Sequence, residues 1–193
     1  MSVARIVLLM LCVTLISVMW TGQAAARKIP GASSYERGQT KLAATFRVGL
    51  AGGTFTVKGT PMDGLVVSVP PNAWEALERR GSRERLRQVE LSLSYDDGKV
   101  VQNGRVNEGG PYAIVFDAHP VVDGQVAAHA LNEFSAPISF TVPSARANAL
   151  AVPFYVNDEA SLEGCQLVRK DPGHFVFDTF HPGLYVWVWA LLP

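Results

Sequence analysis

Five arginines within nine residues form the densest charge cluster of the chain. They are Arg79, Arg80, Arg83, Arg85 and Arg87. Guanidinium groups pair readily with phosphates and carboxylates, so this cluster could bind lipid headgroups, polyanionic glycans or an acidic protein subunit. Because Glu75, Glu78 and Glu90 stand three or four residues from several of these arginines, a solvated surface that pairs with itself is the alternative.

An aromatic series occupies the last apolar segment of the chain. Tyr185, Trp187 and Trp189 alternate with aliphatic residues, so in a strand the three rings share one face. If this face is exposed, its flat rings with polar edges suit a sugar or a protein partner. Because the other face is apolar as well, the alternative is a central strand covered on both sides, with the segment around Trp74 as one cover.

The residue types that catalyse reactions or bind metals are present but poorly spaced. No pair among His119, His129, His174 and His181 has the tight spacing of zinc ligands. The sequence also lacks the nucleophile elbow of hydrolases, the metal-binding helix of metalloproteases and the glycine loops that bind phosphates. We therefore expect no metal, no cofactor and no enzymatic activity. A small hydrolase or metalloenzyme is the alternative, and it would need two histidines close to each other or to an aspartate.

The first 26 residues have the layout of a secretory signal peptide, with Arg5, an apolar run at 6–20 and a small-residue exit that ends at Ala26. Fifteen apolar residues span roughly 22 Å at a rise of about 1.5 Å, which is less than the ~30 Å of a hydrocarbon core. We expect cleavage after Ala26 and a location in the periplasm, on the cell surface or outside the cell. An uncleaved leader that contacts the inner membrane through residues 6–26 is the alternative.

The remaining 167 residues (193 − 26) are enough for one domain with a sizeable core. Charge is balanced at 17 basic and 17 acidic residues, and an exported chain is not expected to bind nucleic acid. Since Cys12 leaves with the leader, Cys165 cannot form an intramolecular disulfide in the mature chain. We expect Cys165 to be a small buried side chain, with a reactive or intermolecular thiol as the alternative.

Residues 27–42 show no hydrophobic period and are predicted to be a flexible arm, while residues 43–193 are predicted to form the domain. From Ala43 onward, apolar residues tend to alternate with polar ones, in short runs that Gly, Pro, Asn and Asp separate. This pattern predicts twelve strands, at 45–49, 54–58, 65–69, 89–95, 99–106, 112–117, 125–131, 138–142, 151–156, 166–169, 174–179 and 184–191.

One segment breaks the strand pattern and predicts a short helical insert at about 72–88. Asn72 is expected to cap it, Glu75 stands three residues later as a capping-box partner, and Gly81 ends its first part. Asp97-Gly98 predicts a hairpin turn in the following strands. Because helices do not alternate with strands, we predict an all-β fold, a two-sheet antiparallel β-sandwich with this one insert; a closed barrel is the alternative.

Two short motifs resemble the start of the β-sandwich domain shared by ankyrins, netrin receptors and zonula occludens proteins. The first is Gly-Gly-Thr within 52–56, and the second is the strand at 64–73 that ends in Pro-Pro-Asn-Ala. Some members of that family cleave themselves at a His-Phe-Ser triplet. Here His181-Pro-Gly and His174-Phe-Val have no hydroxyl at the third position. The resemblance therefore implies a sandwich used for docking, without self-cleavage.

Together these features predict an exported, non-catalytic accessory or interaction domain. We expect it to bind another envelope or surface protein through a sheet face or the arginine-rich insert. If the leader is retained, the same domain becomes an anchored extracytoplasmic subunit of a membrane complex. A second alternative is a carbohydrate-binding module that uses Tyr185, Trp187 and Trp189.

Overall fold

The described part of the protein is all-β. The computed structural model describes residues 33–74, 86–102, 105–107, 113–143, 149–171 and 173–191. The predicted leader and residues 75–85 of the predicted insert lie outside these ranges. Within them the chain forms strands and turns but no helix, which confirms the predicted fold class. Accordingly, no helix of the described part is long and apolar enough to cross a membrane.

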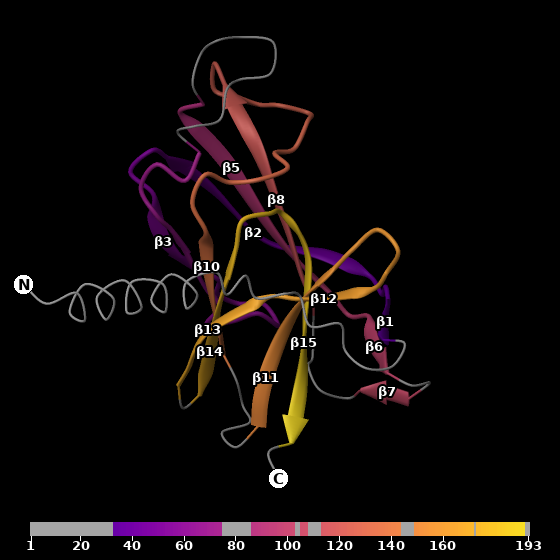
Figure 1. The fold of residues 1–193 in the computed structure, drawn as a ribbon. Coiled ribbons are helices and arrows are strands. Elements are labelled where there is room, and N and C mark those ends of the chain that lie inside the picture. The colour runs from indigo at the N-terminus through magenta and orange to yellow at the C-terminus, as the bar shows by residue number, and fades with distance from the viewer. Residues whose placement is uncertain are drawn as a thin grey trace, which may run out of the picture.

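The strands are short and are distributed along the whole described chain (Figure 1). They are β1 (Ser33–Glu36), β2 (Thr40–Gly49), β3 (Gly53–Thr56), β4 (Val66–Val69), β5 (Gln88–Asp96), β6 (Lys99–Gln102), β7 (Arg105–Asn107), β8 (Ala113–Val122), β9 (Gln125–Val126), β10 (Ile138–Pro143), β11 (Ala149–Val156), β12 (Leu162–Gly164), β13 (Gln166–Asp171), β14 (His174–Thr179) and β15 (Gly183–Leu191).

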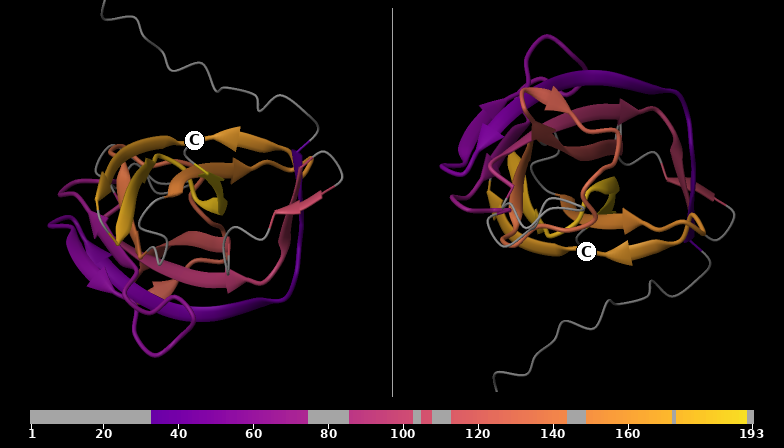
Figure 2. Two further views of the ribbon diagram at one scale, coloured as in Figure 1. Left: turned by 90° about the horizontal axis from the view of Figure 1, so that it is seen from below. Right: turned by 90° about the horizontal axis from the view of Figure 1, so that it is seen from above.

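These strands form three antiparallel sheets. The large sheet has the order β12-β11-β15-β8-β5-β2, with β9 paired to β8. The opposing sheet has the order β13-β14-β10-β4-β3, and a small sheet has the order β1-β6-β7. The large and opposing sheets enclose a common core in a sandwich-like arrangement, which Figure 2 shows end on.

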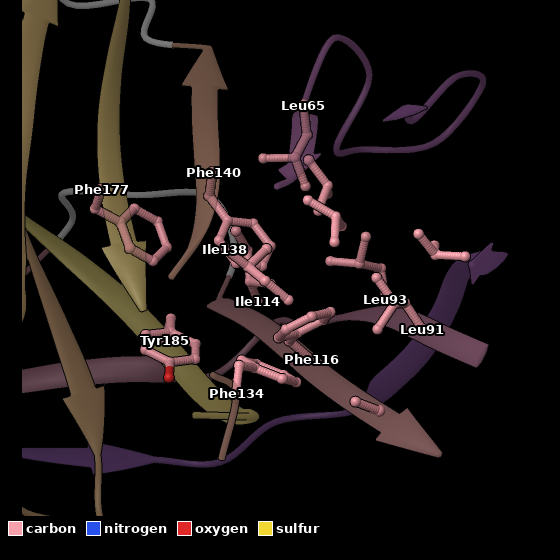
Figure 3. Close-up of a cluster of buried hydrophobic side chains, with 14 of the residues drawn as sticks. Leu65, Leu91, Leu93, Ile114, Phe116, Phe134, Ile138, Phe140, Phe177 and Tyr185 are labelled. Carbon is pink, nitrogen blue, oxygen red and sulfur yellow. The ribbon is translucent and has the colours of Figure 1, made fainter. Parts of the chain in front are cut away.

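The main core lies between the large and opposing sheets, and we call it the first cluster. Strand β5 shows how alternation builds it, since Val89, Leu91 and Leu93 are buried while the residues between them are only partly covered. Phe140 of β10 enters from the opposing sheet (Figure 3), where its ring lies 5.0 Å from Phe116 and 5.1 Å from Phe177, centroid to centroid.

A second cluster lies outside this core. Six of its buried residues come from the large sheet (Ala113, Phe154, Val156, Leu162, Leu184 and Val186), and Tyr35 and Val100 of the small sheet complete it. Strand β15 therefore runs between two apolar layers, because Tyr185 and Trp187 belong to the first cluster and Leu184 and Val186 to the second. This confirms the interpretation of β15 as a central strand covered on both sides, and Trp74 is part of the first cluster that covers one of them.

Strand boundaries differ from the predictions in several places, among them β8, which continues to Val122 instead of ending at 117, and β12, for which the pattern predicts no strand. The predicted arm at 27–42 contains β1 and the start of β2, and the predicted strand at 99–106 is divided into β6 and β7. Of the strand predicted at 125–131, only β9 pairs as a strand. The residues after it follow β8 through isolated hydrogen bonds, such as that from the Leu131 N–H to the Ala118 carbonyl at 2.7 Å.

The predicted helix start also differs from the structure. Residues 71–74 form a turn, and Asn72 has a φ of 60°, in the left-handed region, whereas an N-cap residue has an extended backbone. The N–H of Asn72 donates to the Leu50 carbonyl at 2.7 Å, which ties this turn to the end of β2. At the other end of the predicted insert, Gln88 is already the first residue of β5.

Candidate functional site

The structure describes only part of the predicted binding residues. Arg87 is exposed and directly precedes β5, whereas Arg79, Arg80, Arg83 and Arg85 lie outside the described residues. Tyr185 and Trp187 are buried, with 1% and 7% of their surface exposed. The side chain of Trp189 is likewise outside the description. The rings of Tyr185 and Trp187 therefore offer no free face to a sugar, which favours the covered-strand interpretation over an aromatic binding face.

One segment of the described chain contains only basic charged residues, and we call it the basic edge. It consists of residues 37–58, which include β2 and β3 and carry four basic side chains and no acidic one. Those side chains are exposed in every case, and they are Arg37, Lys41, Arg47 and Lys58. Figure 1 shows β2 and β3 following one another on this side of the fold.

The basic edge joins the free margins of two sheets. Strand β2 is the last strand of the large sheet and β3 the last of the opposing sheet. The rings of Phe46 and Phe55 pack across this corner with their centroids 4.8 Å apart. Arg87 lies beside the end of β2, because Gln88 and Gly49 are paired in the β2–β5 ladder. The ladder thus places the described end of the arginine-rich segment next to the basic edge.

Strand β2 leaves one margin of its backbone without a strand partner among the described residues. It is ten residues long, and its pairing with β5 shifts register between Leu42 and Ala44. Leu42 is 66% exposed, the largest value among the exposed apolar side chains. Arg47 contacts β5 through its Nε, 3.0 Å from Glu90 Oε2, and its Nη1 donates to the Gly124 carbonyl at 3.4 Å.

A buried carboxylate lies at the opposite end of β2. Asp96, which is 1% exposed, accepts hydrogen bonds from the Tyr35 hydroxyl at 2.7 Å, the Gly38 N–H at 2.8 Å, the Thr40 hydroxyl at 2.8 Å and the Gly98 N–H at 2.9 Å. Three of these four donors lie within residues 35–40, which run from β1 through the connection to the first residue of β2. We call this group of five residues the Asp96 clasp.

The clasp shifts the acidity of both its titratable members. Burial raises the pKa of the Asp96 carboxyl, but the hydrogen bonds from Tyr35, Gly38, Thr40 and Gly98 outweigh it, so the pKa lies below its ordinary value. Burial, followed by the hydrogen bond and charge of Asp96, raises the pKa of Tyr35 well above its ordinary value. Asp96 is therefore ionised and Tyr35 protonated at neutral pH, as a hydrogen bond from hydroxyl to carboxylate requires.

A second polar group closes the corner before β15. The hydroxyls of Thr179 and Tyr185 lie 2.6 Å apart, and both donate to the carbonyl of His181. The N–H of His181 in turn donates to the Thr179 hydroxyl at 3.0 Å. Burial is the main reason why the pKa of Tyr185 is raised. Because every partner here is neutral, the group fixes a chain corner without burying a charge.

Cys165 lies at the crossover from β12 to β13. Its side chain is partly buried against the first cluster, and its N–H donates to the Pro153 carbonyl at 3.0 Å. Burial raises the pKa of its thiol to about 12. Since the thiolate is the reactive form, the side chain behaves as a small apolar group, as the sequence predicts.

The histidines do not come together. His174 Nε2 lies 3.0 Å from Asp171 Oδ2 across a hairpin turn, His119 Nδ1 lies 3.0 Å from the Ala127 carbonyl, and His181 Nδ1 lies 3.1 Å from the Asn132 carbonyl. Within the described part of the chain, no three His, Cys, Asp or Glu residues are grouped so that they could hold a metal ion. His119 and His174 therefore have contacts within their own turns, and His181 contacts a segment 49 residues earlier in the chain.

No protein-family model matches the chain, and no curated protein matches it either. The two motifs that resemble the ankyrin-type sandwich form the β3–β4 hairpin, in which Gly53 pairs with Val69. Gly52 has a φ of 70°, and a Cβ there would clash with the Val69 carbonyl oxygen, so this turn requires glycine. The geometry of the hairpin therefore explains the motif, and this explanation does not depend on membership of a particular family.

Sequence reasoning missed two features of this surface. The absence of acidic residues from 37–58 is visible in the sequence, and counting charges along the chain would have found the basic edge. The clasp has no such signal, because an aspartate before Asp97-Gly98 is expected to be an exposed turn residue. Only the return of Tyr35, 61 residues away in the chain, buries it.

Proposed function

We propose that the chain is an exported, non-catalytic interaction domain that binds an acidic segment of another envelope or surface protein along the basic edge. The observation that carries this proposal is the position of the four basic side chains. Lys41 and Arg47 lie on β2, the last strand of the large sheet, while Arg37 precedes β2 and Lys58 follows β3; the segment that carries all four has no acidic residue. The chain as a whole has no net charge, so the positive potential is a local property of this side.

The margin of β2 supports a protein partner in particular. A free strand margin exposes backbone donors and acceptors that an extended segment can pair with, and this is a common mode of peptide recognition. The register shift near Leu42 and the lysine beside it discourage indiscriminate pairing, as they do in many edge strands. Charge then selects which segments approach, and the exposed Leu42 side chain offers one apolar contact.

The described end of the arginine-rich segment lies beside this surface. Arg87 stands beside Gly49 at the end of β2, so the partner of the basic edge and the partner expected for Arg79, Arg80, Arg83, Arg85 and Arg87 can be one protein. Arg47 already contacts Glu90, so it contributes less free charge than Lys41 or Lys58. The resemblance to the ankyrin-type sandwich, as a docking module, agrees with this role.

The anchored form of the proposal differs only in the leader. If residues 1–26 are retained, the domain is an outward-facing subunit of a membrane complex that binds its partner in the same way. Intact-mass measurement of the natural protein separates the two forms. A chain that begins at Arg27 would rule out the anchor.

The test compares two double variants in capture of partners from the native envelope. Lys41→Gln/Lys58→Gln removes free charge from the basic edge, and Arg169→Gln/Lys170→Gln removes the same formal charge from β13, the far margin of the opposing sheet. We expect the first variant to lose a defined set of captured proteins and the second to retain it. Equal losses from both would show a response to net charge alone, and no loss from either would contradict the proposal.

A further variant tests the arginine-rich segment. Replacing its five arginines by glutamine should reduce capture of the same proteins as Lys41→Gln/Lys58→Gln. Raising the salt concentration should weaken binding of the wild type, because exposed charges beyond about 8 Å are screened at physiological ionic strength. If the arginine variant loses a different set of proteins, the two surfaces do not share a partner.

A further inference from the structure

The first strand of the domain is held differently from every other part of the core. Residues 33–40, which we call the strap, comprise β1 and the connection to β2. Figure 2 shows β1, in indigo, closing one side of the molecule between the orange C-terminal strands and the layer of β2 and β5. Its sheet partner is β6, with Ser33–Glu36 opposite Lys99–Gln102.

Only a few contacts join the strap to the large sheet. The N–H of Tyr35 donates to the Ala160 carbonyl at 3.1 Å, and Ser34 forms an isolated bridge with Ser161. The Tyr35 ring contributes to the second cluster. Asp96 accepts hydrogen bonds from Tyr35, Gly38 and Thr40, the last of which is the first residue of β2. Asp97 Oδ1 accepts a further hydrogen bond from the Gln39 N–H at 2.6 Å.

The first cluster does not depend on the strap. None of its buried residues belongs to residues 33–40 or to β6. Removing the strap would leave the interior between the large and opposing sheets covered, and it would uncover only the second cluster. A segment with few core contacts of its own can open without global unfolding.

The closed position of the strap is tightly defined. A Cβ at Gly98 would clash with the Glu36 carbonyl and the Tyr35 hydroxyl, and a Cβ at Gly38 would clash with Asp97 and the backbone of Gly98. Both glycines are needed for close approach of two chain segments. The strap therefore docks in one specific position rather than lying loosely on the surface.

The charge of Asp96 gives this position a lock. A buried carboxylate is stable only while hydrogen bonds replace its water, and three of the four donors move away with the strap. Once the strap opens, water can solvate the same carboxylate. The open form therefore leaves no buried charge without a partner, which makes opening a reversible step.

We propose that the strap detaches from the sandwich as a unit, with the Asp96 clasp as its lock, and that its opening uncovers the apolar second cluster on β11 and β15. The strap is the first described element after the predicted leader. It is therefore also the point at which the N-terminal segment is fastened to the domain. Residues 37–40 belong to both the strap and the basic edge, so opening also moves Arg37, but the step itself requires no bound partner.

Native-state hydrogen exchange of the purified protein tests the proposal with two tyrosine variants. Tyr35→Phe keeps the ring in the second cluster and removes its hydrogen bond to the carboxylate. Tyr185→Phe removes an equally buried hydroxyl from the first cluster. We expect Tyr35→Phe to speed exchange of strap amides by about tenfold or more while the amides of β8 and β10 are unchanged. We expect Tyr185→Phe to make the difference between the free energy of strap opening and the free energy of global unfolding smaller, not larger.

A disulfide lock provides a second measurement. Ser34→Cys/Ser161→Cys places two thiols at paired backbone positions, and the oxidised form should slow exchange of strap amides to the rate of β8 amides. Reduction should restore the faster rate. The proposal is overturned if wild-type strap amides already exchange as slowly as those of β8, or if Tyr35→Phe speeds all strands alike.

Discussion

Two buried tyrosines stabilise two regions of this protein by different means. Tyr185 lies among aromatic rings of the first cluster, and its hydroxyl bonds only neutral groups. Tyr35 is buried almost as deeply, at 4% exposure, but it belongs to the smaller second cluster and donates to a carboxylate. Both rings pack in an apolar cluster, but the hydroxyl of Tyr185 bonds neutral groups whereas the hydroxyl of Tyr35 bonds a charged carboxylate.

Because the hydroxyl partners differ in charge, the stability of the two regions should respond differently to pH. A neutral group within the main core contributes to global stability and is insensitive to acid. A charged acceptor at the margin contributes most while it is ionised and its donors are docked. The same residue type therefore supports permanent closure in one region and conditional closure in the other.

The largest expected effect is on the first cluster. Phe140→Ala should lower the free energy of unfolding by about 3–5 kcal/mol, because it removes a fully buried ring that packs against Phe116, Phe177 and Tyr185. Denaturant unfolding measures this change. Phe180→Ala is the matched control, since Phe180 is 48% exposed, and it should change stability by less than about 0.5 kcal/mol. Similar losses from both variants would mean that the first cluster is not the main core.

A smaller loss is expected at the clasp. Asp96→Asn removes the charge; if its amide oxygen keeps the place of Oδ1, which accepts from Gly38 and Gly98, its NH2 group replaces the oxygen that accepts from the Thr40 hydroxyl. We expect a loss of about 1.5–3 kcal/mol in closure of the strap at pH 7, since hydrogen bonds to charged groups have this strength. Hydrogen exchange of strap amides measures it. A uniform loss in all strands would place the clasp within the main core and remove the contrast between the regions.

The pH dependence of strap closure sharpens the contrast further. The folded pKa of Asp96 lies below its ordinary value, so its contribution is complete above pH about 4 and is lost as the pH falls through the folded pKa. The titratable group that contacts Asp96 is Tyr35, and Asp97 acts on Tyr35 through its charge. We expect acid to speed exchange in the strap before it affects β8 or β10, after correction for intrinsic exchange rates.

The control for this profile is Asp96→Asn. In this variant the titration of Asp96 cannot speed exchange of the strap amides in acid, because the titrating group is absent. At alkaline pH both regions should weaken, since the pKa values of Tyr35 and Tyr185 are both raised and each contribution is lost as the pH rises through the folded value. An identical acid limb in wild type and variant would exclude Asp96 as the lock.

The parts of the fold that follow from local pattern could be predicted from the sequence. Alternation in Leu91, Leu93 and Tyr95 predicts one face of β5, on which the first two are buried and Tyr95 is partly buried. The two apolar faces of β15 indicated cover on both sides. Such patterns arise because each strand must present one or two faces to a core. They do not state which strand lies at a margin, so the sequence shows the run of basic residues at 37–58 but not its place beside the sheet margins.

The clasp illustrates what local pattern cannot give. Strand β1 has a single deeply buried side chain, Tyr35, so its sequence shows no period that would separate it from a flexible arm. It forms a strand because it pairs with β6 and its Tyr35 hydrogen-bonds to Asp96, and both partners lie more than sixty residues later in the chain. Burial of an aspartate is likewise decided by distant donors rather than by its neighbours in the sequence.

The smallest expected effect concerns the second tyrosine of the comparison. Tyr185→Phe should lower the global free energy of unfolding by about 1 kcal/mol, because the ring remains packed and only a neutral hydrogen bond is lost. The loss should be constant between pH 4 and 8, since Thr179 and the His181 carbonyl do not titrate. Thermal or denaturant unfolding at several pH values measures it. A loss that grows in acid would show that the Tyr185 corner depends on a charged group, and the contrast with Tyr35 would then rest on position alone.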